Sequence, residues 1–229
     1  MKILGVKVDN LSLDEVLNKV DGFLEDNKQH YITTPNPEFL VKAQKDKEFK
    51  KILNNADLSI PDGVGLVFAS LLSNEKIKER IAGVDLMKAI CKKAAKKSWP
   101  IFLFGAGPGV AEKAGEKLRR KYKGLEISEN NPAIFFVALG APKQEKWIDE
   151  NLKKMPNVKL AVGVGGSFDF ISGNIKRAPQ FIRLLGLEWL WRLILQPWRI
   201  KRILNAVIIF PWLVLKSKLM YNKNIVKNQ

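Results

Sequence analysis

Hydrophobic residues along the first 170 positions follow two alternating patterns. Short, nearly continuous apolar runs predict strands at 2–8, 30–34, 58–60, 100–104, 133–139 and 160–164. Between them, apolar residues recur every three to four positions and predict helices at 12–24, 38–54, 64–72, 85–97, 110–121 and 143–147. Apolar strands that alternate with helices are typical of a parallel sheet covered on both faces. The predicted fold class is α/β, with a Rossmann-like, mostly parallel sheet.

After Phe170 the alternation stops and only helical periodicity remains, so we expect a helical C-terminal appendage broken at Pro197 and Pro211. The predicted division is a catalytic α/β domain at 1–190 and an appendage at 191–229. The longest apolar run, 203–215, has 13 residues and contains Asn205 and Pro211. A membrane-spanning helix needs about 20 residues, so we expect this tail to lie on a membrane without crossing it.

Charge separates the same two regions. The chain carries a formal charge of +16, and residues 176–229 hold 11 of its 39 Lys and Arg residues and one acid, Glu188. Four of the six tryptophans lie in that stretch: Trp189, Trp191, Trp198 and Trp212. Indole rings among cations suit an anionic headgroup interface. Nucleic acid is not the expected partner, because the basic excess is in an apolar segment and no nucleic-acid-binding motif is present.

The expected compartment is the cytoplasm. The N-terminal residues read as a strand and lack the basic and apolar regions of a secretion signal. The single cysteine, Cys91, excludes a disulfide framework and falls in a core-like pattern.

In parallel sheets, ligands bind beyond the carboxyl ends of the strands. The unusual residues of this chain gather at those predicted ends: Thr34, Asn36, Asp62, Gly105, Gly107, Gln144 and Asp169. The glycine-rich loop 105–109 follows a strand and opens a helix, so its N–H groups could hold a phosphate or diphosphate. The alternative is a tight structural turn, because the loop lacks both the P-loop Lys and full dinucleotide-binding spacing.

Two kinds of residue could supply chemistry. Asp62, between Pro61 and Gly63, is either an ordinary turn former or a carboxylate placed to accept a proton. Arg199 and Arg202 share a helical face, and Arg192 would join it if the helix continued past Pro197. These arginines either face lipid or bind a diphosphate. No metal site is predicted, because the chain has one histidine, one cysteine and no Asp-x-Asp pair.

Six strings carry a specific resemblance when taken in order: Ile32–Glu38, Ile60–Gly65, Arg80–Leu86, Phe102–Ala111, Val137–Trp147 and Val164–Asp169. Together they resemble the WecG/TagA/CpsF glycosyltransferase family over essentially the whole chain, and the tail resembles the TagA branch. The resemblance implies an inverting, metal-independent enzyme on the cytoplasmic membrane face that needs no cofactor. It implies transfer of N-acetylmannosamine from UDP-N-acetylmannosamine to undecaprenyl-diphosphate-linked N-acetylglucosamine, in synthesis of the wall teichoic acid linkage unit.

The resemblance also implies roles for residues. Asp62 matches the general base, and Thr34 and Asn36 match neighbours that shape the sugar pocket. Contacts to the nucleotide sugar or diphosphate match Arg80, Gln144 and the loop containing Gly105 and Gly107. Asp169 matches a polar residue of the pocket wall, and the arginines that complete the active site match Arg192, Arg199 and Arg202.

One stretch departs from the family. Only ten residues lie between Tyr122 and Ala133, where the family has roughly twenty more, including a short strand and helix. We therefore expect the sheet to be one element short. The alternatives kept open are a membrane-surface protein that binds a nucleotide sugar without turnover, and a related transferase that uses another UDP-sugar. A homo-oligomer is also open.

Overall fold

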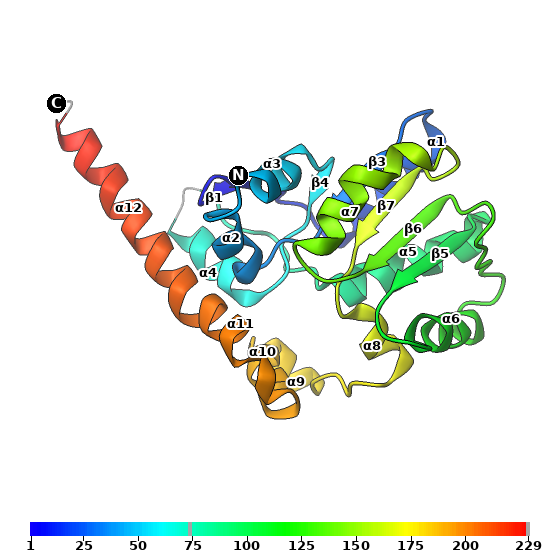
Figure 1. The fold of residues 1–229 in the computed structure, drawn as a ribbon. Coiled ribbons are helices and arrows are strands. Elements are labelled where there is room, and N and C mark those ends of the chain that lie inside the picture. Colours follow the sequence, from blue (N-terminus) through cyan, green and yellow to red (C-terminus); the bar gives the residue numbers. More distant parts are fainter. Residues whose placement is uncertain (73–74, 228–229) are drawn as a thin grey trace.

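The computed structural model describes residues 1–72 and 75–227 and contains a parallel five-stranded sheet (Figure 1). Its strand order is β4-β3-β7-β6-β5, and every neighbouring pair is parallel. The strands are β3 (His30–Thr33), β4 (Leu58–Ser59), β5 (Ile101–Gly105), β6 (Ile134–Ala138) and β7 (Leu160–Gly163). The predicted α/β class is confirmed, and all five strands lie within the predicted ranges or one residue from them.

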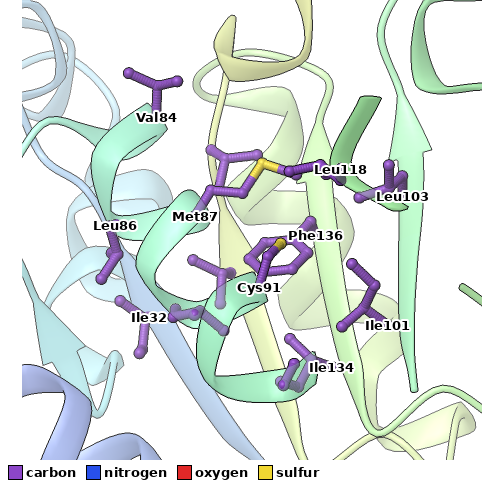
Figure 2. Packing of buried hydrophobic residues seen from close by; sticks show 14 of the residues in the cluster. Ile32, Val84, Leu86, Met87, Cys91, Ile101, Leu103, Leu118, Ile134 and Phe136 are labelled. Atoms are coloured by element: carbon purple, nitrogen blue, oxygen red, sulfur yellow. The ribbon is translucent and has the colours of Figure 1, made fainter. Parts of the chain in front are cut away.

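Helices cover both faces of the sheet. One face packs against α1 (Leu13–Glu25), α5 (Gly83–Lys97), α6 (Val110–Lys121) and α8 (Ser167–Ser172). Figure 2 shows Met87 and Cys91 of α5 on this face, close to Phe136. The neighbouring side chains Phe135 and Val137 point the other way and pack with α3 (Lys47–Asn55) and α7 (Lys143–Asn151). This alternation along β6 is the period of two that a strand imposes.

The structure corrects two predicted elements near the N-terminus. The predicted strand 2–8 is an antiparallel hairpin of β1 (Lys2–Ile3) and β2 (Val6–Lys7). Leu4 and Gly5 make the turn with φ of 50° and 76°, and Leu4 gave no turn signal in the sequence. The predicted helix 38–54 is split into α2 (Pro37–Ala43) and α3, because Asp46 accepts the N–H of Phe49 and starts a new helix.

The shortened connection after α6 leaves a trace of a sixth strand. Ile127 forms one parallel bridge with Ile101 on the outer edge of β5. The Ser128 N–H donates to the Ile101 carbonyl at 3.0 Å, and the chain then turns directly into β6. Among the described residues the sheet has no full strand beyond β5, as the short connection predicts.

The C-terminal residues form a helical arm that crosses the molecule beside α4 (Val64–Leu71) (Figure 1). The arm comprises α9 (Gln180–Leu184), α10 (Glu188–Leu195), a 3₁₀ turn Pro197–Arg199, α11 (Ile200–Leu204), a π-helical turn Asn205–Ile209 and α12 (Phe210–Lys227). A second 3₁₀ turn, Leu152–Lys154, follows α7. The predicted break at Pro197 is confirmed.

The predicted break at Pro211 is wrong. Pro211 is the second residue of α12, which directly follows the π-helical turn. Proline is tolerated in a first helical turn, where a missing N–H costs little, and a π turn changes the local bonding pattern. The stretch Pro197–Met220 is therefore continuous, and by length and composition it could cross a membrane. The argument from a 13-residue run does not exclude a span.

Candidate active site

Asp62 lies where the segments that follow the carboxyl ends of β3, β4 and β7 meet. It follows β4, and its N–H donates to the Pro35 carbonyl after β3 at 2.9 Å. Its Oδ2 accepts the N–H of Gly83, at the start of α5, at 3.2 Å. A Cβ on Gly83 would lie 3.6 Å from the hydroxyl oxygens of both Thr34 and Ser167. The structure thus brings Thr34 and Asp62 to one place, as predicted from their positions after neighbouring strands.

The surroundings of Asp62 favour its protonated form. Burial raises the pKa of its carboxyl from the usual value to about 6, which is the largest effect. The Gly83 N–H lowers this pKa, the charge of Glu188 raises it, and the cations Arg80 and Arg192 lower it. A carboxylate that ionises near pH 6 is a stronger base than an ordinary aspartate and remains largely ionised at pH 7.

We predict that kcat/KM falls as pH drops through about 6, because Asp62 accepts a proton only when it is ionised. Activity should level off above that pH and decline about tenfold per pH unit well below it. Measurements of kcat/KM at constant ionic strength between pH 4.5 and 8 check this profile.

The control for that profile is Glu145→Gln, since burial also raises the pKa of Glu145, to about 7. The break near pH 6 should persist in this variant. If the break disappears, Glu145 is the titrating group and Asp62 is not the base.

Arg192 extends from α10, in the appendage, to the carboxyl end of the sheet, the mouth of the candidate site. A Cβ on Gly166, just beyond β7, would lie only 2.7 Å from Arg192 Nη2, so glycine makes room for the guanidinium. The guanidinium carbon lies 4.5 Å from the ring centroid of Phe170, a cation–π contact. Arg192 Nε and Nη2 and Arg199 Nε are buried, and among the described residues none has a hydrogen-bond acceptor. Buried, unpaired N–H donors on two arginines favour an anionic ligand.

The arginine charges also repel one another. Burial lowers the pKa of Arg199 to about 10, and the charges of Arg192 and Arg202 contribute in the same direction. Burial likewise lowers the pKa of Arg192, while Glu188 and Asp62 oppose that shift. With a pKa of about 10, Arg199 remains protonated at neutral pH. A bound diphosphate would relieve this repulsion and supply the missing acceptors.

Arg202 differs from the other two arginines because it has a protein partner. Its Nε donates to both carboxylate oxygens of Glu38 at 2.9 Å, and Lys42 Nζ lies 2.8 Å from Glu38 Oε1. Glu38 is a buried residue of α2. This cluster attaches the appendage to the core. Its direct role toward a ligand stays a prediction.

The glycine-rich loop has a clear structural function at one position. Gly105 has φ of +96°, and a Cβ there would lie 2.9 Å from Leu139 Cδ2, so the tight turn requires glycine. Gly107 is more open, and α6 begins at the loop without a side-chain cap. Strands lie about 4.8 Å apart, so the loop after β5 is roughly 10 Å from the end of β7 along the sheet. Anion binding by this loop stays a prediction.

Gln144 joins two of the carboxyl-end loops. Its Oε1 accepts the N–H groups of Gly140, at 3.2 Å, and Gly165, at 3.0 Å, and its Nε2 donates to Glu145 Oε1 at 2.6 Å. The residue is fully buried. These bonds hold the loops after β6 and β7 in place. The predicted contact of Gln144 with a nucleotide sugar is not tested by this arrangement.

The remaining predicted residues lie at the same edge of the sheet. Arg80 Nη2 donates to the Arg183 carbonyl at 3.0 Å. Asn36 caps α2 by accepting the Phe39 N–H at 3.1 Å. Asp169 Oδ2 lies 3.7 Å from an ideal Cβ on Gly166, the glycine that also contacts Arg192.

Sequence reasoning missed the ion pairs that dock the appendage. Arg177 contacts both carboxylate oxygens of Asp85 at 2.6 Å and lies 3.4 Å from Glu188 Oε1. Glu188 starts α10, the helix that carries Arg192, and it influences the pKa of Asp62. A signal was present, since Glu188 is the one acid among eleven basic residues in the tail.

A carboxylate with a raised pKa at the carboxyl end of a parallel sheet, near arginines with unpaired buried donors, is an arrangement that suits an α/β enzyme for group transfer from an anionic donor. The model of the glycosyl transfer family described as WecG/TagA/CpsF matches residues 1–131 and 125–224. The chain belongs to that glycosyltransferase family.

Curated relatives match most of the chain. A Bacillus subtilis protein is 37% identical over 216 residues, covering 83% of this chain and 84% of the relative. A Staphylococcus aureus protein is 30% identical over 236 residues, covering 94% and 92%. Both are named N-acetylglucosaminyldiphosphoundecaprenol N-acetyl-beta-D-mannosaminyltransferase.

These matches also bear on the short connection after α6. The two stretches of the family match meet at residues 125–131. The match with the Staphylococcus aureus protein has 236 aligned positions, but it uses only 94% of the 229 residues of this chain, which is about 215 residues. About 20 aligned positions therefore have no counterpart in this chain. That number is close to the roughly twenty residues by which the connection is expected to be short, and their place in the chain stays a prediction.

Proposed function

We propose that this protein transfers N-acetylmannosamine from UDP-N-acetylmannosamine to the N-acetylglucosamine of an undecaprenyl-diphosphate acceptor, in wall teichoic acid linkage-unit synthesis. The names of the relatives supply the acceptor and the transferred sugar. The observation that carries the proposal is the meeting of Asp62, a base from the core, with Arg192, a cation from the appendage. A protein that only binds a nucleotide sugar does not need a carboxylate with a raised pKa at this position.

The chemistry is a single displacement. The acceptor hydroxyl attacks the anomeric carbon, its proton passes to the Asp62 carboxylate, and the anomeric C–O bond to UDP breaks with both electrons leaving on the diphosphate. One displacement inverts the anomeric centre. Thr34 lies beside this path, but its hydroxyl donates to the Gly163 carbonyl at 3.0 Å and so orients the pocket wall.

The negative charge on the leaving UDP is balanced by arginines in this proposal. Arg192 and Arg199 carry buried N–H donors without a protein acceptor, and such donors stabilise developing charge strongly in a water-poor site. Within residues 1–72 and 75–227, no group of three or more His, Cys, Asp and Glu could hold a metal ion. We therefore propose a metal-independent reaction.

The appendage, residues 191–229, places the enzyme on the inner face of the cell membrane in this proposal. Its side chains Trp198 and Trp212 are exposed and accompany the basic excess of the tail. Two contacts favour an arm that lies on the surface over one that crosses the bilayer. Phe210 is buried against the core beside Gly65, and Arg202 is paired with Glu38.

The test is a product assay with the purified protein and a short-chain lipid-diphosphate N-acetylglucosamine acceptor. UDP-N-acetylmannosamine should give a β-linked disaccharide-lipid, identified by mass and NMR, at a rate at least tenfold above UDP-N-acetylglucosamine. Faster turnover with another UDP-sugar would indicate a related transferase. Tight UDP binding with no product from any donor would indicate a binding protein.

A further inference from the structure

Six large apolar side chains outside the predicted appendage are exposed on two short helices. On α4 and the residue after it they are Phe68, Leu71 and Leu72, and on α9 and its C-cap they are Phe181, Leu184 and Leu185. Their exposed fractions run from 41% for Leu72 to 79% for Leu184. Single exposed apolar residues are ordinary, but a group of this size usually marks an interaction surface.

The two helices are neighbours of each other and of the appendage. A Cβ on Gly186, just after α9, would lie 2.9 Å from Val64 Cγ2 at the start of α4. A Cβ on Gly65, the next residue of α4, would lie 3.6 Å from Phe210 Cε1 of α12. The contacts place α9, α4 and α12 next to one another, and exposed apolar side chains also occur at Ile208, in the π-helical turn, and at Trp212 of α12.

We propose that α4 and α9 form a second lipid-contacting surface, which inserts into the same anionic bilayer as the appendage. This inference rests on the membrane attachment proposed for the appendage. Charge favours lipid as the partner: α4 contains no charged residue, and residues 176–187 contain no acid and two cations, Lys176 and Arg183, besides Arg177, which is paired with Asp85. Apolar side chains bordered by cations fit an anionic bilayer surface.

The position of α4 gives this surface a consequence for catalysis. The helix begins two residues after Asp62 and has eight residues, so it spans about 12 Å at 1.5 Å per residue. Phe68, Leu71 and Leu72 are three to four positions apart and share one side of the helix, so their insertion would hold Asp62 within about one helix length of the bilayer surface. The headgroup layer is itself about 5–8 Å thick. Asp62 would then face the level at which a lipid-linked diphosphate sugar leaves the bilayer.

Site-specific probes test the insertion directly in the full chain. The one native cysteine, Cys91, is buried and burial raises the pKa of its thiol, so it should not react with a polar label. An environment-sensitive fluorophore is attached to Leu71→Cys, Leu184→Cys or Ile208→Cys. The matched control is Glu116→Cys on α6, an exposed position on the face covered by α6 and α8.

With phosphatidylglycerol vesicles that carry a quencher in the acyl chains, the probes at 71, 184 and 208 should blue-shift and lose at least half of their emission. The probe at 116 should change by less than a tenth.

Three outcomes would contradict the proposal. If the probe at 208 is quenched while the probes at 71 and 184 behave like the probe at 116, the second surface is refuted and the appendage attachment stands. If 208 is also unaffected, the proposed membrane attachment itself fails. A concentration-dependent shift at 71 without vesicles would show a second copy of the chain on this face and would overturn the proposal.

A second measurement links the surface to activity. The triple variant Phe68→Gln, Leu71→Gln, Leu72→Gln should weaken vesicle partition at least tenfold, since each side chain loses apolar burial in lipid. Turnover of a bilayer-embedded acceptor should fall, while turnover of a soluble short-chain acceptor should stay within about twofold. Equal losses on both acceptors would mean that α4 acts through the fold and not through lipid.

Discussion

Asp62→Asn should lower turnover by about 10² to 10⁴, because the amide cannot accept the proton of the attacking hydroxyl. The fold should survive the change. The asparagine oxygen can still accept the Gly83 N–H that Asp62 Oδ2 accepts at 3.2 Å. Folding raises the pKa of this group to about 6, so the ionised carboxylate opposes folding above that pH and the neutral amide removes the opposition. We expect an unchanged or higher Tm at pH 7.5.

UDP affinity separates a lost base from a lost pocket. Asp62→Asn should bind UDP within about threefold of the wild type by calorimetry, because its carboxylate takes the acceptor proton and does not hold the diphosphate. Turnover near the wild-type value would remove Asp62 from the mechanism. Lost turnover together with lost UDP binding would instead assign it a binding role.

Arg192→Ala and Arg199→Ala should each cut turnover of a soluble short-chain acceptor at least tenfold, a loss of about 1.4 kcal/mol in transition-state stabilisation. Both guanidinium groups carry buried donors without a protein acceptor, so they are free to bind the leaving diphosphate. Arg→Lys should restore part of the loss, since lysine keeps the charge but not the planar donor geometry.

Lys201→Ala is the matched control, because Lys201 is exposed on α11 and carries the same charge. All three alanine variants should lose a similar small share of vesicle affinity, as each removes one cation of eleven. Only the two arginine variants should lose turnover. If all three match the wild type on the soluble acceptor, the appendage is an anchor alone.

Point variants test the appendage better than a deletion does. The sequence alone predicts that a chain ending near Leu190 folds, because the strand pattern stops well before that residue. In the structure, Phe210 and Ile203 are buried, and Arg202 neutralises the buried Glu38. Deletion would uncover an apolar face and leave Glu38 with one cationic partner, Lys42. Such a core should be less stable and less soluble than the sequence suggested.

The parts of the fold that were predictable are those set by local patterns. Strand and helix periodicity placed all five strands of the sheet, and α1 begins directly after its N-cap Ser12, within one residue of the predicted start. The failures lie where a local signal was weak or was overridden. Leu4 adopts a left-handed turn without a glycine or asparagine signal. Pro211 continues a helix because a π-helical turn precedes it and Phe210 is held against the core.

The candidate site shows the same division. Thr34 and Asp62 could be placed together because the carboxyl ends of parallel strands meet at one edge. The ion pairs of Arg202 with Glu38 and of Arg177 with Asp85 join residues 164 and 92 positions apart. No periodicity encodes such distant pairings. These ion pairs hold the C-terminal helices against the core. They thereby bring Arg192 of α10 to Gly166, just beyond β7.

The central claim is that a carboxylate from the sheet and arginines from the appendage perform glycosyl transfer without a metal ion. The most direct test is the single-turnover rate of the purified enzyme with UDP-N-acetylmannosamine and a short-chain acceptor, first in excess EDTA and then with Mg²⁺ or Mn²⁺ in excess over the chelator. The account predicts that transfer persists in EDTA and changes by less than about twofold when the ion is added. Abolished transfer in EDTA that either ion restores would contradict it, because the charge on the leaving UDP would then be balanced by metal and not by Arg192 and Arg199.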